Sequence, residues 1–260
     1  QLVAEIQQAL DGDEFELLAQ PIACLSGKAS KLQFEILLRM ADSEGDRIPT
    51  KALFSAAERY RLMPHIDRWV VSTAIAKLSE ARECVDGQNV LFSINLSGQS
   101  LGDDAILEFI EDELQHRDVP ASALCFEITE SAAVSNLDRA KAFIDGLRGL
   151  GCGISLDDFG AGLSSFAYLK SFNVDTLKID GGFIRDIAEN RISESMVAAI
   201  TQVAKVMELQ TVAEYVETEE QRELLVSLGV DYAQGHFIGR PQAIESVLAD
   251  LTDQLKAQTG

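Results

Sequence analysis

The sequence has few histidines and cysteines, and neither type is spaced as a zinc site requires. Its three histidines and four cysteines are widely scattered, and no two cysteines form a CxxC pair. Zinc sites usually take ligands from such closely spaced pairs. We therefore expect no zinc, and we interpret the cysteines as buried, reduced thiols of a reducing compartment. They are Cys24, Cys84, Cys125 and Cys152.

The chain also lacks positive charge and long apolar runs. It has 22 Lys and Arg against 42 Asp and Glu, a net charge of −20. This excludes a generic nucleic-acid polymer or anionic membrane as partner, because both need a basic face. A small anionic substrate stays allowed if metal ions reverse the charge locally. No apolar run approaches the roughly 20 residues that span a bilayer, and no secretory signal is evident. We expect this domain to be cytoplasmic, even if the full-length protein is anchored in a membrane.

The 260 residues alternate between strand-like and helix-like segments. Strands are predicted at 14–22, 31–40, 90–96, 124–129, 153–157, 176–179, 210–213 and 232–237. Most are separated by helical patterns, and only a short turn at 26–28 separates the first two, which favours an antiparallel hairpin. We predict an α/β fold, a TIM-like (β/α)8 barrel with one antiparallel strand near the N-terminus. A doubly wound open sheet is the main alternative.

We expect one domain over residues 13–260, preceded by a helix over residues 1–12. The chain begins with Gln1, not Met, and we interpret that helix as the end of a linker from an upstream domain. No linker or low-complexity segment divides the rest.

Polar residues at the strand ends favour the closed barrel. Six lie at or near the ends of different predicted strands: Asn95, Glu127, Asp157, Lys178, Glu214 and Gln234. Only in a closed barrel must so many strand ends face a common mouth.

The segment GISLDDFGAG, residues 153–162, places two adjacent carboxylates after a buried strand. Paired acids at such a position are costly unless a positive charge lies between them. Asp157 and Asp158, together with Glu35, Asn95 and Glu127, offer oxygen ligands only, which select Mg²⁺, Mn²⁺ or Ca²⁺. Two such ions about 4 Å apart, bridged by one carboxylate, commonly serve phosphodiester cleavage.

Further polar residues suit the same chemistry. Lys178 can orient or activate a water or neutralise a transition state, and Glu214 can be a ligand or a general base. Arg39 can grip a phosphate through its planar fork, and Gln20 and Gln234 can bond substrate. Each also has an ordinary interpretation as a surface charge or turn residue. The acids, however, interrupt otherwise apolar strands at matching ends, which favours a metal site.

Eight segments occur together in a family order. They are QPI (20–22), EILLR (35–39), SINLSGQSL (93–101), FEITES (126–131), LDDFGAG (156–162), LKID (177–180), VAEYVE (212–217) and AQGHFIGRP (233–241). Over almost the whole chain they resemble the EAL-domain cyclic-di-GMP phosphodiesterases. The resemblance implies that Glu130 steadies the loop over 159–165 and that Lys178, Glu214 and Glu35 are catalytic. It implies metal ligands at Glu35, Asn95, Glu127, Asp157 and Asp158. It implies substrate contacts at Gln20, Leu38, Arg39, Asp180, Gln234 and Pro241.

The resemblance also implies an activity. The expected reaction is hydrolysis of cyclic di-GMP to linear pGpG with two Mg²⁺ or Mn²⁺ ions, inhibited by Ca²⁺, in bacterial signalling. A homodimer and an upstream sensory or diguanylate-cyclase-like domain are expected. The chain departs from the family pattern at Ile36, Leu163, Tyr215 and His236, none of them an expected ligand.

Two alternatives stay open. One is a catalytically silent cyclic-di-GMP receptor. The other is a barrel enzyme that uses Mg²⁺ and Lys178 to abstract a proton from a carbon acid.

Overall fold

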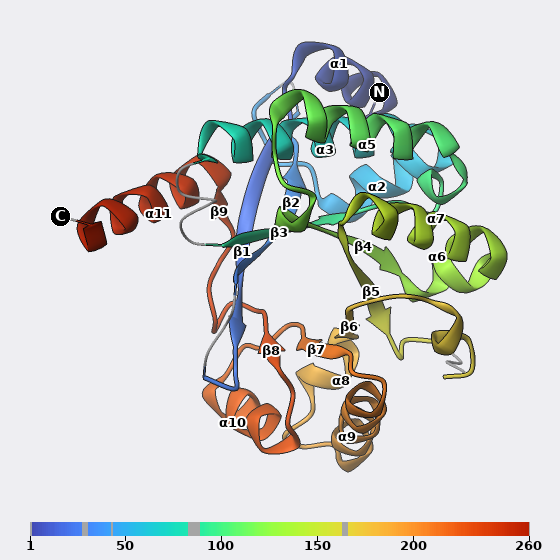
Figure 1. Ribbon diagram of the computed structural model, residues 1–260, viewed down its shortest axis with the longest axis vertical. Helices are drawn as coiled ribbons and strands as arrows, with labels where there is room; N and C mark the ends of the chain where they lie inside the picture. Colours follow the sequence, from blue (N-terminus) through green and yellow to red (C-terminus); the bar gives the residue numbers. More distant parts are fainter. Residues whose placement is uncertain (1, 28–30, 43, 83–88, 163–165, 260) are drawn as a thin grey trace.

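Eight strands close into a barrel in the part of the chain that the computed structural model describes, residues 2–27, 31–42, 44–82, 89–162 and 166–259 (Figure 1). Their order around the barrel is β2-β3-β4-β5-β6-β7-β8-β1, and pairing of β1 with β2 completes the circle. The predicted barrel is confirmed. The strands are β1 (Glu16–Cys24), β2 (Leu32–Arg39), β3 (Val90–Asn95), β4 (Leu124–Thr129), β5 (Gly153–Phe159), β6 (Thr176–Ile179), β7 (Gln210–Ala213) and β8 (Tyr232–Ala233).

Strand β1 runs against the direction of the others. It pairs antiparallel with β2 on one side and with β8 on the other, while β2 to β8 are parallel to one another. The hairpin expected from the short turn is therefore present. A two-residue strand that the sequence did not predict, β9 (Gln242–Ala243), adds to β1 opposite Leu18 and Ala19.

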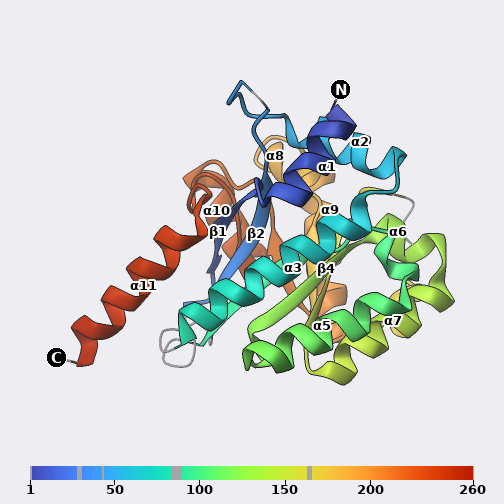
Figure 2. The same cartoon turned by 90° about the horizontal axis from the view of Figure 1, so that it is seen from above.

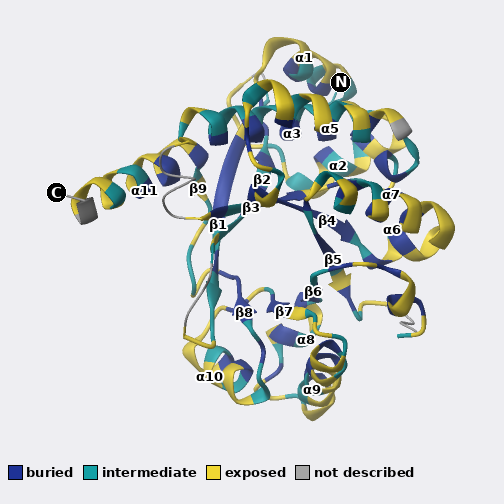
Figure 3. Ribbon diagram, in the orientation of Figure 1, coloured by how far each residue is buried: buried dark blue, intermediate teal, exposed yellow. Residues whose placement is uncertain are grey.

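Helices surround the strands, and their buried faces supply the core (Figures 1 and 3). In Figure 2, α3, α5 and α7 lie side by side over one part of the barrel. No helix among the described residues is both long enough and apolar enough to cross a membrane. The helices are α1 (Leu2–Gly12), α2 (Thr50–Arg59), α3 (Met63–Glu80), α5 (Asp104–Arg117), α6 (Glu130–Ser135), α7 (Leu137–Leu150), α8 (Gly181–Arg185), α9 (Arg191–Val206), α10 (Glu219–Leu228) and α11 (Ile244–Thr259).

The N-terminal helix packs onto the body of the domain. Its Ile6 and Ala9 are fully buried, and it contacts α2 and α3. Just beyond it, the Trp69 indole donates to Asp13 Oδ1 at 2.7 Å and its ring meets Phe15 edge-on. By contrast, α11 extends away from the barrel and ends at the C-terminus (Figures 1 and 2).

Some predicted bounds differ from those observed. The short helices α6 and α8 were not predicted. The sequence also predicts a short helix over 164–170. This segment begins outside the described residues, and the chain forms a 3₁₀ turn over Tyr168–Ser171. Strand β8 stops at Ala233, not at residue 237. Beyond it, Gly235 has a φ of 156°, and a Cβ there would lie 2.2 Å from the Val216 carbonyl oxygen. Only glycine permits the chain to turn this close to its neighbour.

A buried aspartate anchors the segment after β3. Asp67 of α3 is 3% exposed and accepts hydrogen bonds from the Ser97 backbone N–H at 3.0 Å and from the Ser97 and Ser100 hydroxyls, both at 2.6 Å. Burial raises the pKa of this carboxyl, and the three donors oppose the shift. The contact holds α3 against the chain that leaves the barrel mouth.

We predict that Asp67→Ala lowers the free energy of unfolding by about 3 kcal/mol, because three donors lose a buried partner. Urea unfolding followed by circular dichroism measures the change. The exposed Asp250→Ala on α11 is the matched control, with an expected change within about 0.5 kcal/mol. Equal unfolding midpoints for the two variants would contradict the anchoring role.

Candidate active site

One buried lysine lies at the centre of the barrel mouth. Lys178 of β6 is 1% exposed, and its Nζ is surrounded by carboxylates from other strands. The distances from Nζ are 2.6 Å to Glu127 Oε2, 2.8 Å to Glu214 Oε1, 3.1 Å to Glu35 Oε2 and 3.7 Å to Asp157 Oδ1. Glu35, which is 143 positions from Lys178 in the sequence, thus meets the other carboxylates at one ammonium group.

Amide side chains complete the hydrogen bonding of Glu35. Asn95 Nδ2 donates to Glu35 Oε1 at 2.7 Å, and Gln234 Nε2 donates to Glu35 Oε2 at 2.6 Å. Gln234 also donates to Gln20 Oε1 at 3.1 Å, and Gln20 donates to the Gly239 carbonyl at 3.0 Å. This network connects β2 to β3, to the residue that follows β8 and to β1, so it fixes the Glu35 carboxylate from several sides.

A β-bulge allows two adjacent aspartates to serve the same mouth. Along β5 and β6, Leu156 pairs with Leu177 and Phe159 with Ile179, so two residues of β5 stand opposite one of β6. Neighbours in a regular strand face opposite sides, whereas a bulge redirects one of them. Asp158 takes a left-handed φ of 52°, and its N–H donates to Asp157 Oδ1 at 2.9 Å. The sequence pattern did not reveal this bulge.

The oxygen atoms at the mouth fit divalent cations. Carboxylate oxygens of Asp157, Asp158 and Glu214 lie within 4.8 Å of one another. With Glu35 and Glu127, five carboxylates share one lysine as their buried counter-charge. This excess of negative charge, presented by oxygen donors alone, is what a hard divalent cation would neutralise.

The charges perturb one another strongly. Burial disfavours the Lys178 ammonium, but Asp157, Glu127, Glu214 and Glu35 outweigh it and hold the lysine pKa well above its ordinary value. Burial raises the pKa of Glu127 well above normal, against the opposing effect of Lys178. Burial also raises the pKa of Glu214, to about 8. For Glu35, Lys178 and the two amides outweigh burial and lower the pKa. Lys178 is therefore a charged group.

The loop after the aspartates is held by Glu130. Its Oε2 accepts the Gly160 N–H at 2.9 Å, and its Oε1 accepts the Tyr168 hydroxyl. Glu130 itself is 6% exposed at the start of α6. The geometry suits the expected loop-steadying role, although residues 163–165 of that loop lie outside the described part. Nothing in the sequence predicted the hydrogen bond between Tyr168 and Glu130.

The expected substrate residues fall into two groups. Arg39 ends β2, Asp180 caps α8 through the Gly182 N–H, and Pro241 precedes β9 beside β1, all on the mouth side. Leu38 does not reach the mouth with its side chain, which is 5% exposed in the main hydrophobic core. Strand alternation explains this, because Leu38 shares a face with Ile36 and not with Glu35.

A model of the EAL domain family matches residues 3–241. The chain belongs to the EAL domain family. Among curated EAL relatives, it is 40% identical over 241 residues to the cyclic di-GMP phosphodiesterase PdeB of Shewanella oneidensis, covering 93% of this chain and 28% of the relative. It is 38% identical to the cyclic di-GMP phosphodiesterase PdeF of Escherichia coli, covering 96% and 33%. The chain thus spans about a third of the length of these relatives.

Solved EAL structures share the fold. The PaMucR phosphodiesterase in complex with c-di-GMP superposes with a TM-score of 0.88 at 31% identity, covering 95% of this chain and 99% of that one. The FimX EAL domain from Pseudomonas aeruginosa bound to c-di-GMP gives a TM-score of 0.86 at 30% identity, covering 94% and 97%.

The departures from the EAL pattern lie in different surroundings. Ile36 is 2% exposed in the core, as strand alternation predicts, and His236 is exposed, while Leu163 lies outside the described residues. Tyr215 has a left-handed φ of 56°, and its ring lies 4.3 Å from the Arg185 guanidinium. The same ring covers Gly181, where a Cβ would lie 2.0 Å from Tyr215 Cδ2.

We predict that Tyr215→Ala is less stable than Tyr215→Gly by about 1 kcal/mol. Both variants lose the stack on Arg185, but only alanine keeps the unfavourable left-handed backbone next to Glu214. Urea unfolding of the two purified variants measures the difference. An alanine variant as stable as the glycine variant would show that this turn does not need the left-handed conformation.

Proposed function

We propose that this EAL domain hydrolyses cyclic di-GMP to linear pGpG in bacterial signalling. The observation that carries the proposal is the buried Lys178 ammonium enclosed by four carboxylates at the barrel mouth, beside the oxygen cluster of Asp157, Asp158 and Glu214. The relatives named as cyclic di-GMP phosphodiesterases and the homologous domains bound to c-di-GMP support the choice of substrate.

Two divalent cations, Mg²⁺ or Mn²⁺, belong to the proposal. Their ligands would be Glu35, Asn95, Glu127, Asp157 and Asp158, and Glu214 lies close enough to the aspartates to join them. When bound, such cations supply Lewis-acid stabilisation of the phosphate and an acidified water.

The reaction is in-line displacement at phosphorus. The oxygen of a water bonds to phosphorus, the P–O3′ bond breaks, and the 3′ oxygen takes up a proton, leaving a 5′-phosphate. Lys178, charged and fixed by its carboxylates, orients the water or neutralises the charge that develops on the phosphate. Glu214, 2.8 Å from that ammonium, is positioned to accept the proton of the water in its ionised form. Glu35 holds the cluster together as ligand and hydrogen-bond acceptor.

The remaining mouth residues would hold the dinucleotide. Arg39 grips a phosphate oxygen, Gln20 and Gln234 donate or accept hydrogen bonds, and Asp180 and Pro241 contact the bases or riboses. Leu38 would act through its backbone, because its side chain is in the core.

The context of the domain completes the proposal. We expect a cytoplasmic homodimer in which Glu130 and the loop after Asp158 connect the dimer face to the site. Residues 1–12 would join residues 13–260 to an upstream sensory or diguanylate-cyclase-like domain. The lengths of the relatives leave room for such a domain.

The direct test incubates the purified chain with cyclic di-GMP and Mg²⁺ or Mn²⁺ and follows pGpG by chromatography. We expect Lys178→Met and Glu35→Gln each to lower turnover at least about 100-fold, because each removes a charge from the reacting centre while keeping the shape of the side chain. Exposed Glu220→Gln on α10 is the matched control, and its rate should equal that of the unmodified chain.

The receptor alternative has its own outcome in this assay. Saturable binding of cyclic di-GMP without pGpG in any metal would replace the hydrolase with a silent receptor. If the chain showed no binding and no turnover of cyclic di-GMP, the carbon-acid enzyme would become the favoured alternative.

We also predict that Ca²⁺ inhibits turnover. Ca²⁺ has a larger and looser coordination shell than Mg²⁺ and would misplace the attacking water. Adding Ca²⁺ to the Mg²⁺ assay should lower the rate in a way that excess Mg²⁺ reverses. An undiminished rate in saturating Ca²⁺ alone would contradict this cation requirement.

A further inference from the structure

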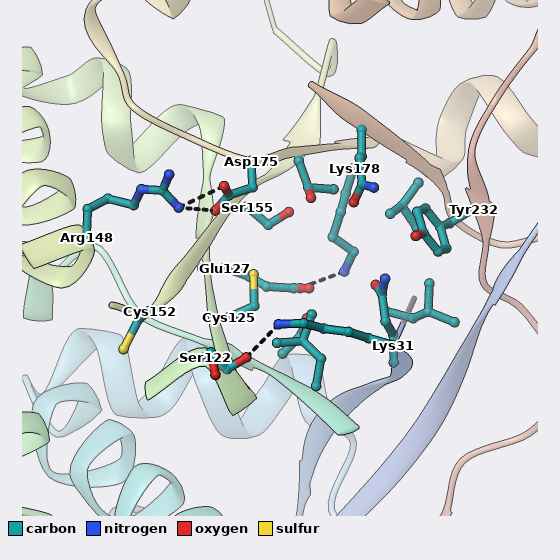
Figure 4. A pocket seen from close by; sticks show the side chains of 18 of the residues that line it. Lys31, Ser122, Cys125, Glu127, Arg148, Cys152, Ser155, Asp175, Lys178 and Tyr232 are labelled. Atoms are coloured by element: carbon teal, nitrogen blue, oxygen red, sulfur yellow. Dashed lines mark hydrogen bonds and ion pairs between the residues drawn. The ribbon is translucent and has the colours of Figure 1, made fainter. Parts of the chain in front are cut away.

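A cavity of about 280 Å³ lies inside the barrel at the end opposite to the proposed active site. Gly153, Thr176 and Gln210, the first residues of β5, β6 and β7, line it, so it opens at the N-terminal ends of the strands. Its inner end is formed by the Glu127–Lys178 ion pair (Figure 4). The cavity and the active site therefore share these two side chains as a common wall.

Small side chains on β3 to β6 create this space. Ser93, Cys125, Gly153, Ser155 and Thr176 all line the cavity. The interiors of most such barrels are filled at these levels by Val, Ile and Leu. The cavity therefore results from small residues on four consecutive strands, β3 to β6.

The two sides of the cavity differ in chemistry. On one side, Ile22, Val212 and Tyr232 form an apolar cluster separate from the main core. On the other, the Cys125 thiol hydrogen-bonds with Ser93, whereas Ser155 Oγ, 2% exposed, has no hydrogen-bond partner among the described residues. A buried hydroxyl without a partner is costly, and here it points into the cavity (Figure 4).

A lysine provides positive charge at the opening. Lys31 Nζ donates to the Ser122 carbonyl at 2.8 Å, and no carboxylate in the described part of the chain pairs with it. The neighbouring Arg148 is neutralised by Asp175, whose two oxygens accept from Nη1 at 2.7 Å. Among the described residues, the opening therefore carries one positive charge that no carboxylate pairs with, next to a cavity that is apolar on one side and lined by hydroxyls on the other.

We propose that this cavity binds a small aromatic or heteroaromatic acid. The ring lies against Ile22, Val212 and Tyr232, a polar ring substituent bonds to Ser155 Oγ, and the acid group pairs with Lys31. The volume suits a single ring, since sites for drug-sized ligands begin near 300 Å³. A bound ring would contact Glu127 and Lys178 from the cavity side. Because the same two residues border the mouth, the ring would connect the two sites.

The test titrates 4-hydroxybenzoate into the purified chain without cyclic di-GMP or metal, with 4-hydroxybenzamide as the uncharged probe of equal shape. Because no turnover is measured, the outcome is independent of the proposed hydrolase activity. Calorimetry should show saturable binding of the acid, about tenfold tighter than of the amide. A soaked crystal should place the ring between Ser155 and Val212.

Two variants assign the contacts. Lys31→Gln should abolish the preference for the acid over the amide, while Lys51→Gln, an exposed lysine on α2, should leave it unchanged. Ser155→Ala should weaken both probes about fivefold. No saturable binding up to the solubility limit, or binding that neither Lys31→Gln nor Ser155→Ala alters, would overturn the proposal.

Discussion

The arrangement of the barrel mouth depends on the buried ammonium group of Lys178. An ammonium group removed from water is costly unless carboxylates surround it, and Lys178 obtains them from β2, β4, β5 and the end of β7. A slip of one residue in any of these strands would turn the side chain to the other face of the barrel. The strand registers and the site are therefore set by the same contacts. The carboxylates at the mouth outnumber this one ammonium group, and the remaining negative charge favours the binding of cations.

The barrel interior divides at the level of Lys178 and Glu127. Toward the mouth, charged and amide side chains bond to one another, and Glu35 receives three donors. Toward the opposite end, serines, a thiol and a glycine leave open space. The ion pair between Lys178 and Glu127 is common to both halves. A ligand bound in the cavity would therefore touch the same ion pair that borders the mouth, and this shared contact would couple the two sites.

Irregular backbone gathers at the mouth. The bulge at Asp157 and Asp158 lies near the end of β5, while the left-handed Tyr215 and the close turn at Gly235 follow β7 and β8. Regular alternation would present only one of the two aspartates to the mouth, so the departure from regularity is what permits both to serve it. Glu130 then fixes the chain after the bulge through the Gly160 N–H. Among the described residues, the other pairings of the barrel strands show no such shift of register.

The sequence by itself determined the barrel, its antiparallel first strand and the polar residues that gather at its mouth. The predicted bounds of β4, β6 and β7 agree with the structure because apolar strands and the breaks between them are local signals. Tertiary structure alone decided the bulge at Asp158, the short strand β9 and the cavity beside Ser155. Each of these arises from contacts between segments far apart in the chain, where packing and hydrogen bonding to a distant neighbour outweigh the local preference of the residue.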